Sequence, residues 1–372
     1  MSTVEFKLAA GTNVGLFRKN NEDNFIVSPD LATAQWLLPK DDEYAELGQY
    51  GALLVVADGM GGMNAGEVAS AIAVETVQQM FTPDNIAPVV DDSKAIQEFM
   101  EGVAKTADLN ILNRSRDDSS TQGMGTTIVM AWILGQRVYV SWCGDSRCYV
   151  YNKKRGLRRL SKDHSFVQEL VDKGELEPEY ASDHPLSNII TRCLGNEEKR
   201  AEPETRIYEL YDGDVIMLCS DGLCGLCQDD HIAEVIDEFK ENPQECRNEL
   251  ISAALSKGGH DNVTVALCTV HLDRTEEDYP SSEDEDGETV VETSEGMGQQ
   301  AEGGSVSPEA EDEQEVLANT LKNITPPKRQ RQLWIFLFLL LLVAVACYFY
   351  WFYNQETVTP IIQDMMKKFH LR

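Results

Sequence analysis

The chain has 372 residues, of which 42% are hydrophobic, so it is long enough for one large domain or two ordinary ones with a substantial core. Its formal net charge of −31 argues against a nucleic-acid-binding protein, because a phosphate backbone attracts Lys and Arg. The nine cysteines show no spacing typical of a secreted framework, and residues 1–10 carry no signal-peptide pattern, which favours a reducing, cytoplasmic setting for most of the chain.

An acidic pair lies between two predicted strands near the N-terminus. Residues 4–10 and 25–27 have the apolar composition of strands, and Arg18, Glu22 and Asp23 lie in the polar stretch between them. Because neighbouring residues of a strand face opposite ways, one carboxylate can face a ligand while the other braces it.

The stretch from Gly51 to Ser70 is the strongest single signal in the chain. Residues 52–57 predict a buried strand that ends in Asp58, the glycines that follow allow a tight turn, and a helix is predicted from Asn64. A carboxylate at a strand end beside glycine backbone is a good site for a hard cation. The same pattern also fits an ordinary strand–turn–helix unit in which the Asp is a turn residue.

The middle of the chain predicts a helix followed by antiparallel strands. Apolar spacing indicates a helix over residues 93–113. Strands at 124–134 and 137–142 are separated by Gly135-Gln136, which is typical of a hairpin and therefore of an antiparallel sheet. Asp145 lies in a Gly-Asp-Ser turn directly after the second of these strands.

Two segments are predicted to lie outside this regular pattern. Residues 30–50 are polar and predict a surface loop, and residues 161–195 predict a helical flap over the edge of the main body. The remaining predicted elements are strands at 214–220 and 263–272 and helices at 229–239 and 243–256. Asp221 follows the first of these strands, and Asp261 and Asn262 precede the last.

The chain changes character after the last predicted strand. Between residues 275 and 321 there are 16 Asp and Glu and no Lys or Arg, which predicts a disordered linker over residues 274–332. Residues 333–353 carry no charge, are long enough to span a bilayer and have aromatic residues near both ends. They are therefore predicted to form a transmembrane helix.

The charges around this span predict its orientation. Lys328, Arg329 and Arg331 directly precede it, and positive charge next to a span favours the cytoplasmic side. This predicts a single-pass protein of the cell (inner) membrane, with residues 1–273 as a catalytic domain in the cytoplasm and residues 354–372 as a short tail.

The acidic sites share one character, since they fall at strand ends, at strand starts or in turns. They are Glu22, Asp23, Asp58, Asp145, Asp221 and Asp261. Converging carboxylates repel one another unless cations hold them, and a set of oxygen ligands without Cys or His suits Mg²⁺ or Mn²⁺.

Eight ordered motifs in residues 6–272 resemble the bacterial branch of the metal-dependent Ser/Thr protein phosphatases, type 2C. They are TNVGLFRKNNEDNF, VVADGMGGMNAGEVAS, MGTTIV, GDSRCYVY, LSKDHSFVQELVDKGEL, HPLSNIITRCLG, LCSDGLCGL and GGHDNVTVAL. The resemblance implies an α+β fold, a four-layer α/β/β/α sandwich with two central antiparallel sheets, to which the C-terminal transmembrane helix would be added.

The resemblance also implies a role for each matching residue. The implied metal ligands are Glu22, Asp58, the carbonyl of Gly59, Asp145, Asp221 and Asp261, and Asn262 adjoins the last of them. Asp58 would bridge two ions of Mn²⁺ or Mg²⁺, and Asp145 would help to bind a third. Arg18 would bind the substrate phosphate, and Asp23 would order metal-bound water. A water shared by the metals would attack phosphorus in line, without a phosphoenzyme.

Some residues depart from the family pattern or fit a structural role better. Met60 occupies a position where many eukaryotic relatives have His, and Met cannot protonate a leaving oxygen. His164, His184 and His260 are expected to be structural or surface residues. The CGLC pair, Cys224 and Cys227, is expected to consist of buried or half-buried thiols.

These observations favour a membrane-tethered phosphatase that removes phosphate from Ser and Thr of proteins and opposes a Ser/Thr kinase. A catalytically silent scaffold module is the main alternative, although this chain retains every implied metal carboxylate. A nucleotide-binding loop at DGMGGMNAG is a weaker alternative, because its spacing fits neither GxGxxG nor GxxxxGK[ST].

Overall fold

The structure is a computed structural model that describes residues 4–36, 44–61, 65–181 and 184–272. The linker, the membrane span and the tail predicted for residues 274–372 lie outside the described residues. Among the helices of the described ranges, none combines the length and the apolar character that crossing a membrane requires.

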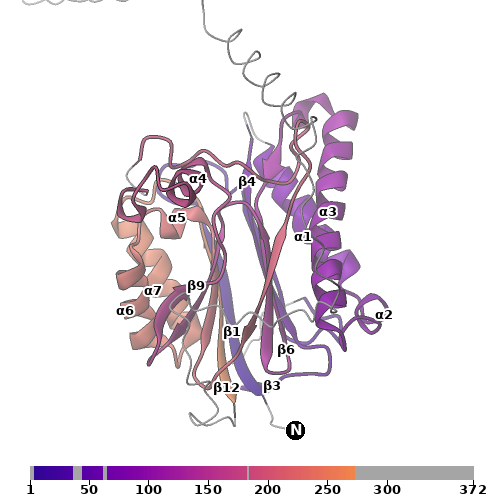
Figure 1. The fold of residues 1–372 in the computed structure, drawn as a ribbon, viewed down its shortest axis with the longest axis vertical. Helices are drawn as coiled ribbons and strands as arrows, with labels where there is room; N and C mark the ends of the chain where they lie inside the picture. Colours follow the sequence, from indigo (N-terminus) through magenta and orange to yellow (C-terminus); the bar gives the residue numbers. More distant parts are fainter. Residues whose placement is uncertain (1–3, 37–43, 62–64, 182–183, 273–372) are drawn as a thin grey trace, which may run out of the picture. The chain divides into compact units, whose positions relative to one another are not determined.

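Two antiparallel sheets form the centre of the described chain (Figure 1). The first contains, in order, β3 (Ala45–Glu46), β1 (Val4–Asn13), β12 (Val263–Leu272), β11 (Val215–Cys219), β8 (Arg147–Asn152) and β9 (Gly156–Arg159). The second contains β10 (Glu204–Glu209), β7 (Arg137–Cys143), β6 (Ile128–Leu134), β4 (Ala52–Met60) and β2 (Asp23–Ser28), with β5 (Gly125–Thr126) paired to β4. Strands β9 and β10 therefore each end a sheet.

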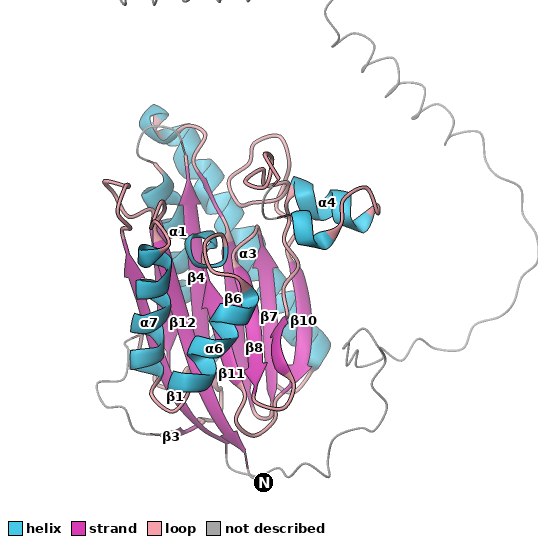
Figure 2. Cartoon of the chain, turned by 90° about the vertical axis from the view of Figure 1, so that its left-hand side faces the viewer, coloured by secondary structure: helices cyan, strands magenta, loops and turns pink. Residues whose placement is uncertain are grey.

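Helices cover the outer face of each sheet, as Figures 1 and 2 show. The second sheet is covered by α1 (Gly66–Met80) and α3 (Ser93–Asp117), with the short α2 (Pro83–Ile86) beside them. The first sheet is covered by α6 (Asp229–Phe239) and α7 (Pro243–Ser256). The other helices are α4 (Phe166–Asp172), α5 (Asp221–Cys224) and 3-10 turns at Ser119–Thr121 and Pro178–Tyr180. Helix α4 projects from the sandwich in Figure 2.

The apolar run of β4 is buried on both sides, which explains why it shows no polar alternation. Leu54 and Val56 pack between the sheets, whereas Leu53 and Val55 pack against the helices. Side chains of a strand alternate between faces, so a central strand of a four-layer structure must be apolar at every position. The predicted four-layer α/β/β/α sandwich is confirmed for the described residues.

Four details of the sequence prediction were wrong. Strand β4 does not end at Asp58 but continues to Met60, because Gly59 and Met60 pair with β5. The loop predicted for residues 30–50 contains the short strand β3, which pairs with β1. Strand β10 was not predicted, and Asp221 begins a helical turn two residues after β11 ends.

Candidate active site

The predicted carboxylates from both sheets meet at one end of the sandwich. Register pairs Asp23 at the start of β2 with Asp58 in β4. Asp221 opens α5 after β11, and its carboxylate lies close enough to that of Asp58 for the two groups to share a proton. Acidic groups from separate strands are thus brought into contact by the pairing of the strands and the stacking of the two sheets.

The environment of these groups favours their protonated forms. Burial raises the pKa of Asp23 to about 7, against the opposing effect of hydrogen bonds from the hydroxyls of Thr264 (2.6 Å) and Ser220 (2.7 Å). Burial, followed by the nearby carboxylates of Asp23 and Asp221, raises the pKa of Asp58 well above its usual range. Burial and the charge of Asp221 raise the pKa of Asp145 to about 8.

Asn262 fastens the loop that carries Arg18 and Glu22 to the start of β12. Its Nδ2 donates to the carbonyls of Val14 (2.9 Å) and Asn20 (3.0 Å), and its Oδ1 accepts from the backbone N–H of Glu22 (2.7 Å). The side chain is buried, so both of its polar atoms are used within the protein. Asn262 is therefore a positioning residue.

Arg18 lies at the exposed side of the carboxylates. Its guanidinium donates to Asp261 Oδ2 at 2.6 Å, and this hydrogen bond raises the pKa of Arg18. The side chain is 49% exposed, which leaves donors accessible to a ligand from solvent. The neighbouring Leu16 and Phe17 are 64% and 68% exposed, so an apolar surface adjoins the guanidinium.

Glycine at position 59 permits three chain segments to approach one another. The N–H of Gly59 donates to the carbonyl of Glu22 at 3.2 Å, and Ser70 Oγ donates to the same carbonyl at 2.6 Å. A Cβ on Gly59 would lie 2.2 Å from the carbonyl oxygen of Gly66 and 2.5 Å from that of Glu22. Only glycine fits this crossing of β4, α1 and the Glu22 segment.

The residues present fit hard divalent cations. Asp145 Oδ1 is buried and has no hydrogen-bond partner within the described residues, and the Asp58 and Asp221 carboxyl groups are in contact. Oxygen donors of this kind are those that Mg²⁺ and Mn²⁺ prefer, and a cation would offset their mutual repulsion. In the part of the chain that the structure describes, no three His, Cys, Asp or Glu side chains are already arranged as a metal cage.

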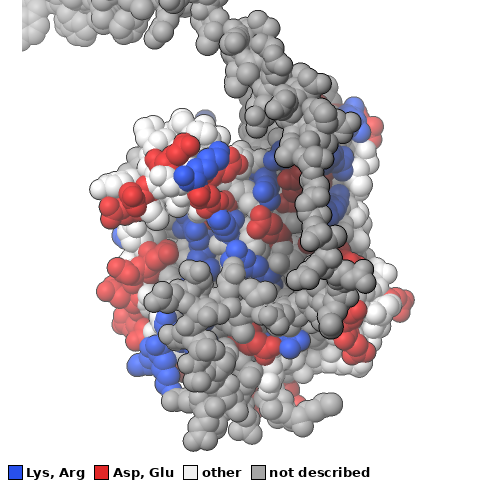
Figure 3. Space-filling model, in the orientation of Figure 1, with Lys and Arg blue, Asp and Glu red and all other residues white. Residues whose placement is uncertain are grey.

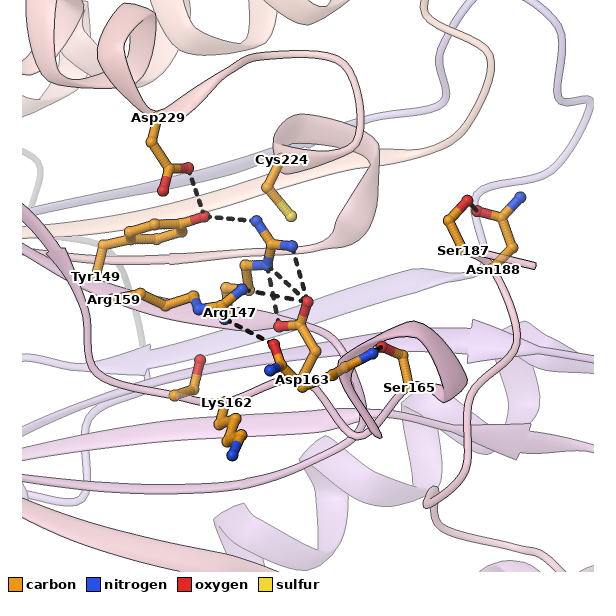
Figure 4. Close-up of polar contacts among 12 residues, drawn as sticks. Arg147, Tyr149, Arg159, Lys162, Asp163, Ser165, Ser187, Asn188, Cys224 and Asp229 are labelled. Atoms are coloured by element: carbon orange, nitrogen blue, oxygen red, sulfur yellow. Dashed lines mark hydrogen bonds and ion pairs between the residues drawn. The ribbon is translucent and has the colours of Figure 1, made fainter. Parts of the chain in front are cut away.

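A second polar network centres on Arg147, which lies two residues after Asp145 (Figure 4). Arg147 donates to both oxygens of Asp163, at 3.0 Å from Nε and 2.8 Å from Nη2, and to the hydroxyl of Tyr149 at 2.9 Å. Tyr149 donates in turn to Asp229 at 3.0 Å. The network joins β8, the segment that leads into α4, and the start of α6, and it therefore anchors the base of the predicted flap beside the turn that carries Asp145.

The structure brings most of the predicted site residues together and adds others. Contacts or charge interactions join these residues: Arg18, Glu22, Asp23, Asp58, Asp145, Asp221 and Asp261. Ser220 and Thr264, whose hydroxyls donate to Asp23, were not predicted as site residues. In the sequence, Ser220 is recognisable as a hydroxyl residue directly before Asp221, and Thr264 as a hydroxyl residue within the apolar strand β12.

His164, Cys224 and Cys227, which were expected to be structural, lie in buried or half-buried positions. His164 is buried, accepts from the N–H of Gly144 at 3.1 Å and lies 3.2 Å from Glu204. Cys227 is buried and Cys224 is half-buried, and both are free thiols. Neither the histidine nor the cysteine pair contributes a side chain to the contacts among the described carboxylates.

Comparison with known proteins gives a consistent answer. A family model described as protein phosphatase 2C matches residues 35–257. The serine/threonine phosphatase stp of Listeria monocytogenes is 33% identical over 256 residues, which are 69% of this chain and 92% of that protein. The serine/threonine protein phosphatase PstP of Mycobacterium tuberculosis is 33% identical over 270 residues, which are 72% of this chain and 46% of that protein.

Solved structures agree with the sequence relatives. The S. agalactiae serine/threonine phosphatase has a TM-score of 0.60 and 30% identity, over 71% of this chain and 98% of that chain. The catalytic domain of PstP in complex with two manganese ions has a TM-score of 0.57 and 31% identity, over 72% of this chain and 100% of that chain. The family model thus spans Asp58, Asp145 and Asp221, and these relatives and solved structures cover 69–72% of the chain.

Proposed function

The chain belongs to the protein phosphatase 2C family and is a metal-dependent protein Ser/Thr phosphatase, and from this premise we propose that it acts on cytoplasmic phosphoproteins while tethered to a membrane. The observation that carries the catalytic part is that Asp23 pairs with Asp58 in the second sheet and accepts hydrogen bonds from Ser220 and Thr264 of the first sheet. These contacts bring strand ends of both sheets together at the carboxylates that the family motifs single out. A scaffold role would not require these carboxylates to converge.

The proposed metal ligands are those that the resemblance implied. Glu22, the Gly59 carbonyl and Asp58 would hold one ion of Mn²⁺ or Mg²⁺. Asp58, Asp221 and Asp261 would hold a second, and Asp145 with Asp221 would hold a third. When bound, such ions supply a nucleophilic water at neutral pH and neutralise charge on the phosphoryl group. The fit is supported by the oxygen-only donors and by Asp145 Oδ1, which has no hydrogen-bond partner among the described residues.

Side chains of the protein itself would bind and orient the substrate. Arg18 is proposed to exchange its bond with Asp261 for a bidentate pair with the substrate phosphate, because its guanidinium is half exposed and next to the carboxylates. Asp23 is proposed to orient the attacking water, since two hydroxyls fix its carboxyl group. Asn262 holds the loop of Arg18 in place.

Membrane tethering is supported by the sequence alone. Residues 333–353 carry no charge, and Lys328, Arg329 and Arg331 precede them. The proposed organisation is a catalytic domain at residues 1–273, an acidic linker at 274–332, the membrane span at 333–353 and a tail at 354–372. An inner-membrane phosphatase with its catalytic domain in the cytoplasm would encounter the products of a Ser/Thr kinase, which it is proposed to oppose.

Removal of the metal tests the proposed catalysis. The full chain in detergent is expected to release phosphate from a phosphothreonine peptide in the presence of Mn²⁺ and to lose that activity in EDTA, because the carboxylates cannot activate water without cations. Activity should return when Mn²⁺ is added in excess of the chelator. Phosphate release that persists in EDTA would contradict the metal assignment, and a folded but inactive protein in Mn²⁺ would favour the scaffold alternative.

Phe17 is expected to contact the peptide that surrounds a phosphorylated residue. It is 68% exposed and adjoins Arg18, so Phe17→Ala should raise KM for a phosphopeptide by about threefold to tenfold, as expected for losing one apolar contact. It should leave KM for p-nitrophenyl phosphate unchanged, because that substrate has no peptide chain. Leu109→Ala is the matched control, since Leu109 is also exposed but lies on α3. Equal effects on both substrates would contradict a peptide contact.

A further inference from the structure

Three arginines lie along the side of the sandwich where both sheets end. Arg158 belongs to β9, Arg155 to the turn before it, and Arg206 to β10. Figure 3 shows Lys and Arg side chains gathered near the centre of this face, beside the position of β9 in Figure 1. We call Arg155, Arg158 and Arg206 the arginine edge. A cationic surface of this kind is notable in a chain of net charge −31.

Each guanidinium of the arginine edge lies over an aromatic ring of the core between the sheets. Arg155 is 3.9 Å from the ring centroid of Tyr211, Arg158 is 5.3 Å from that of Tyr208, and Arg206 is 5.7 Å from that of Trp142. Packing against a ring uses the face of a guanidinium and leaves its in-plane N–H groups able to donate. The rings therefore fix the positions of the three guanidinium groups along the edge.

Carboxylates near the arginine edge are engaged elsewhere. Glu204 accepts from Arg192 at 2.9 Å and contacts His164, and Asp163 accepts from Arg147. Among the described residues Arg158 has no carboxylate partner, and its Nε is buried without a hydrogen bond, while its Nη2 donates to the Tyr208 hydroxyl at 2.7 Å. The charge of the buried Asp214 acts on Arg155 and Arg158, but its two oxygens accept from Asn152 and from the N–H of Tyr211, so an anionic ligand could still satisfy the Nε of Arg158.

The described chain ends next to this edge. The N–H of Leu272, the last residue of β12, donates to Asp212 Oδ1 at 3.0 Å, and the Asp212 carbonyl accepts from Asn152 at 3.2 Å. Asn152 begins the turn that contains Arg155, and Arg155 covers Tyr211, which adjoins Asp212. The described chain therefore ends beside the turn that contains Arg155.

The sequence that follows is the most acidic part of the chain. Residues 276–288 contain eight Asp and Glu and no Lys or Arg. An extended stretch of this length covers about 45 Å, whereas the six residues of β10 span about 20 Å, so the stretch is long enough to run along the edge. Its covalent attachment gives it a high effective concentration at the arginine edge, so weak individual ion pairs suffice.

We propose that residues 276–288 bind to the arginine edge of their own catalytic domain. In this interaction the carboxylates would pair with the guanidinium groups that pack on the rings. The segment would then run along the side formed by the edge strands β9 and β10. The proposal does not depend on catalysis, and its test does not use phosphatase activity.

The test measures binding of a labelled peptide to the full chain in detergent. The peptide comprises residues 275–290, and fluorescence anisotropy is measured at low ionic strength. A chain in which the eight acidic residues of 276–288 are replaced by Gln or Asn should bind the peptide about tenfold more tightly than the native chain, because the internal competitor is gone. Adding Arg155→Gln, Arg158→Gln and Arg206→Gln should weaken that binding by about tenfold.

Two controls separate this contact from general charge attraction and from misfolding. The matched variant carries Lys94→Gln, Lys105→Gln and Lys257→Gln, which remove equal charge from α3 and the end of α7, and it should bind the peptide as before. Arg206→Glu is made alone because Arg206 is exposed, and it should weaken binding severalfold with an unchanged melting temperature.

Three outcomes would overturn the proposal. The first is no binding of the peptide to the chain with the neutralised segment. The second is equal weakening by the lysine variant, which would indicate attraction by net charge. The third is peptide binding that is unaffected by the arginine variants while the same variants lose binding to vesicles that contain phosphatidylserine, which would make the arginine edge a lipid-binding surface.

Discussion

Replacing Asp58 by Asn is expected to lower kcat/KM by about 10³-fold while raising the melting temperature of the metal-free protein. The loss follows because an amide has no charge with which to bind divalent cations, and Asp58 is the proposed ligand of two of them. The melting temperature should rise because, without metal, the Asp58 carboxylate lies unfavourably close to the carboxylates of Asp221 and Asp23.

The sign of the stability change comes from the pKa of Asp58. Burial and like charges raise this pKa in the folded protein, so at neutral pH, above the pKa of the unfolded chain, the carboxylate weakens the fold. Removing the charge should therefore stabilise the metal-free protein by roughly 1 kcal/mol. Addition of Mn²⁺ should stabilise the native protein but raise the melting temperature of the variant much less, because the variant binds the metal weakly.

Asp214→Asn provides the matched control. Asp214 is also buried, and burial raises its pKa to about 6, but it lies at the opposite end of β11 from Asp221. It accepts hydrogen bonds from Asn152 and from the N–H of Tyr211. Its replacement should leave kcat/KM nearly unchanged. Activity of Asp58→Asn within about tenfold of the native value, or an equal loss in Asp214→Asn, would contradict the proposed role of Asp58.

The layers of the fold were predictable because a strand that is buried on both faces is apolar at every position. The run from Ala52 to Ala57 is uniformly apolar, and the helices at Asp229–Phe239 and Pro243–Ser256 have the bounds that their spacing indicated. Strand β10 was missed because its inward-facing positions include Arg206 and its sequence, ETRIYE, is mostly polar. An edge strand that holds an arginine over a core ring does not show the alternation expected of a half-buried strand.

The site was predictable in its residue types but not in its contacts. The acidic motifs indicated which carboxylates converge, whereas the extension of β4 past Asp58 depends on pairing with β5, which is distant in sequence. The clamp made by Asn262 likewise joins segments about 240 residues apart, and no local pattern could show it. The membrane span and the linker remain predictions from composition.

Gly222→Ala is expected to reduce activity by about 10²-fold without changing any metal ligand. A Cβ on Gly222 would lie 1.9 Å from the carbonyl oxygen of Asn262, so the backbone there must move. Gly222 directly follows Asp221, and Asn262 directly follows Asp261, so the movement separates two proposed ligands of one metal. A displacement of about 1 Å in a catalytic site can cost 10²-fold in rate, and the clash itself should cost about 1–3 kcal/mol of stability.

Gly102→Ala separates this steric effect from the general effect of replacing glycine. A Cβ on Gly102, within α3, would meet no atom within 4 Å, so the substitution should leave activity unchanged and stabilise the protein by about 0.5–1 kcal/mol through helix propensity. Affinity for Mn²⁺, measured by calorimetry, should fall in Gly222→Ala and not in Gly102→Ala. If Gly222→Ala binds Mn²⁺ with native affinity and retains full activity, then the spacing between the Asp221 and Asp261 segments does not control the metal site, and these two carboxylates do not share an ion.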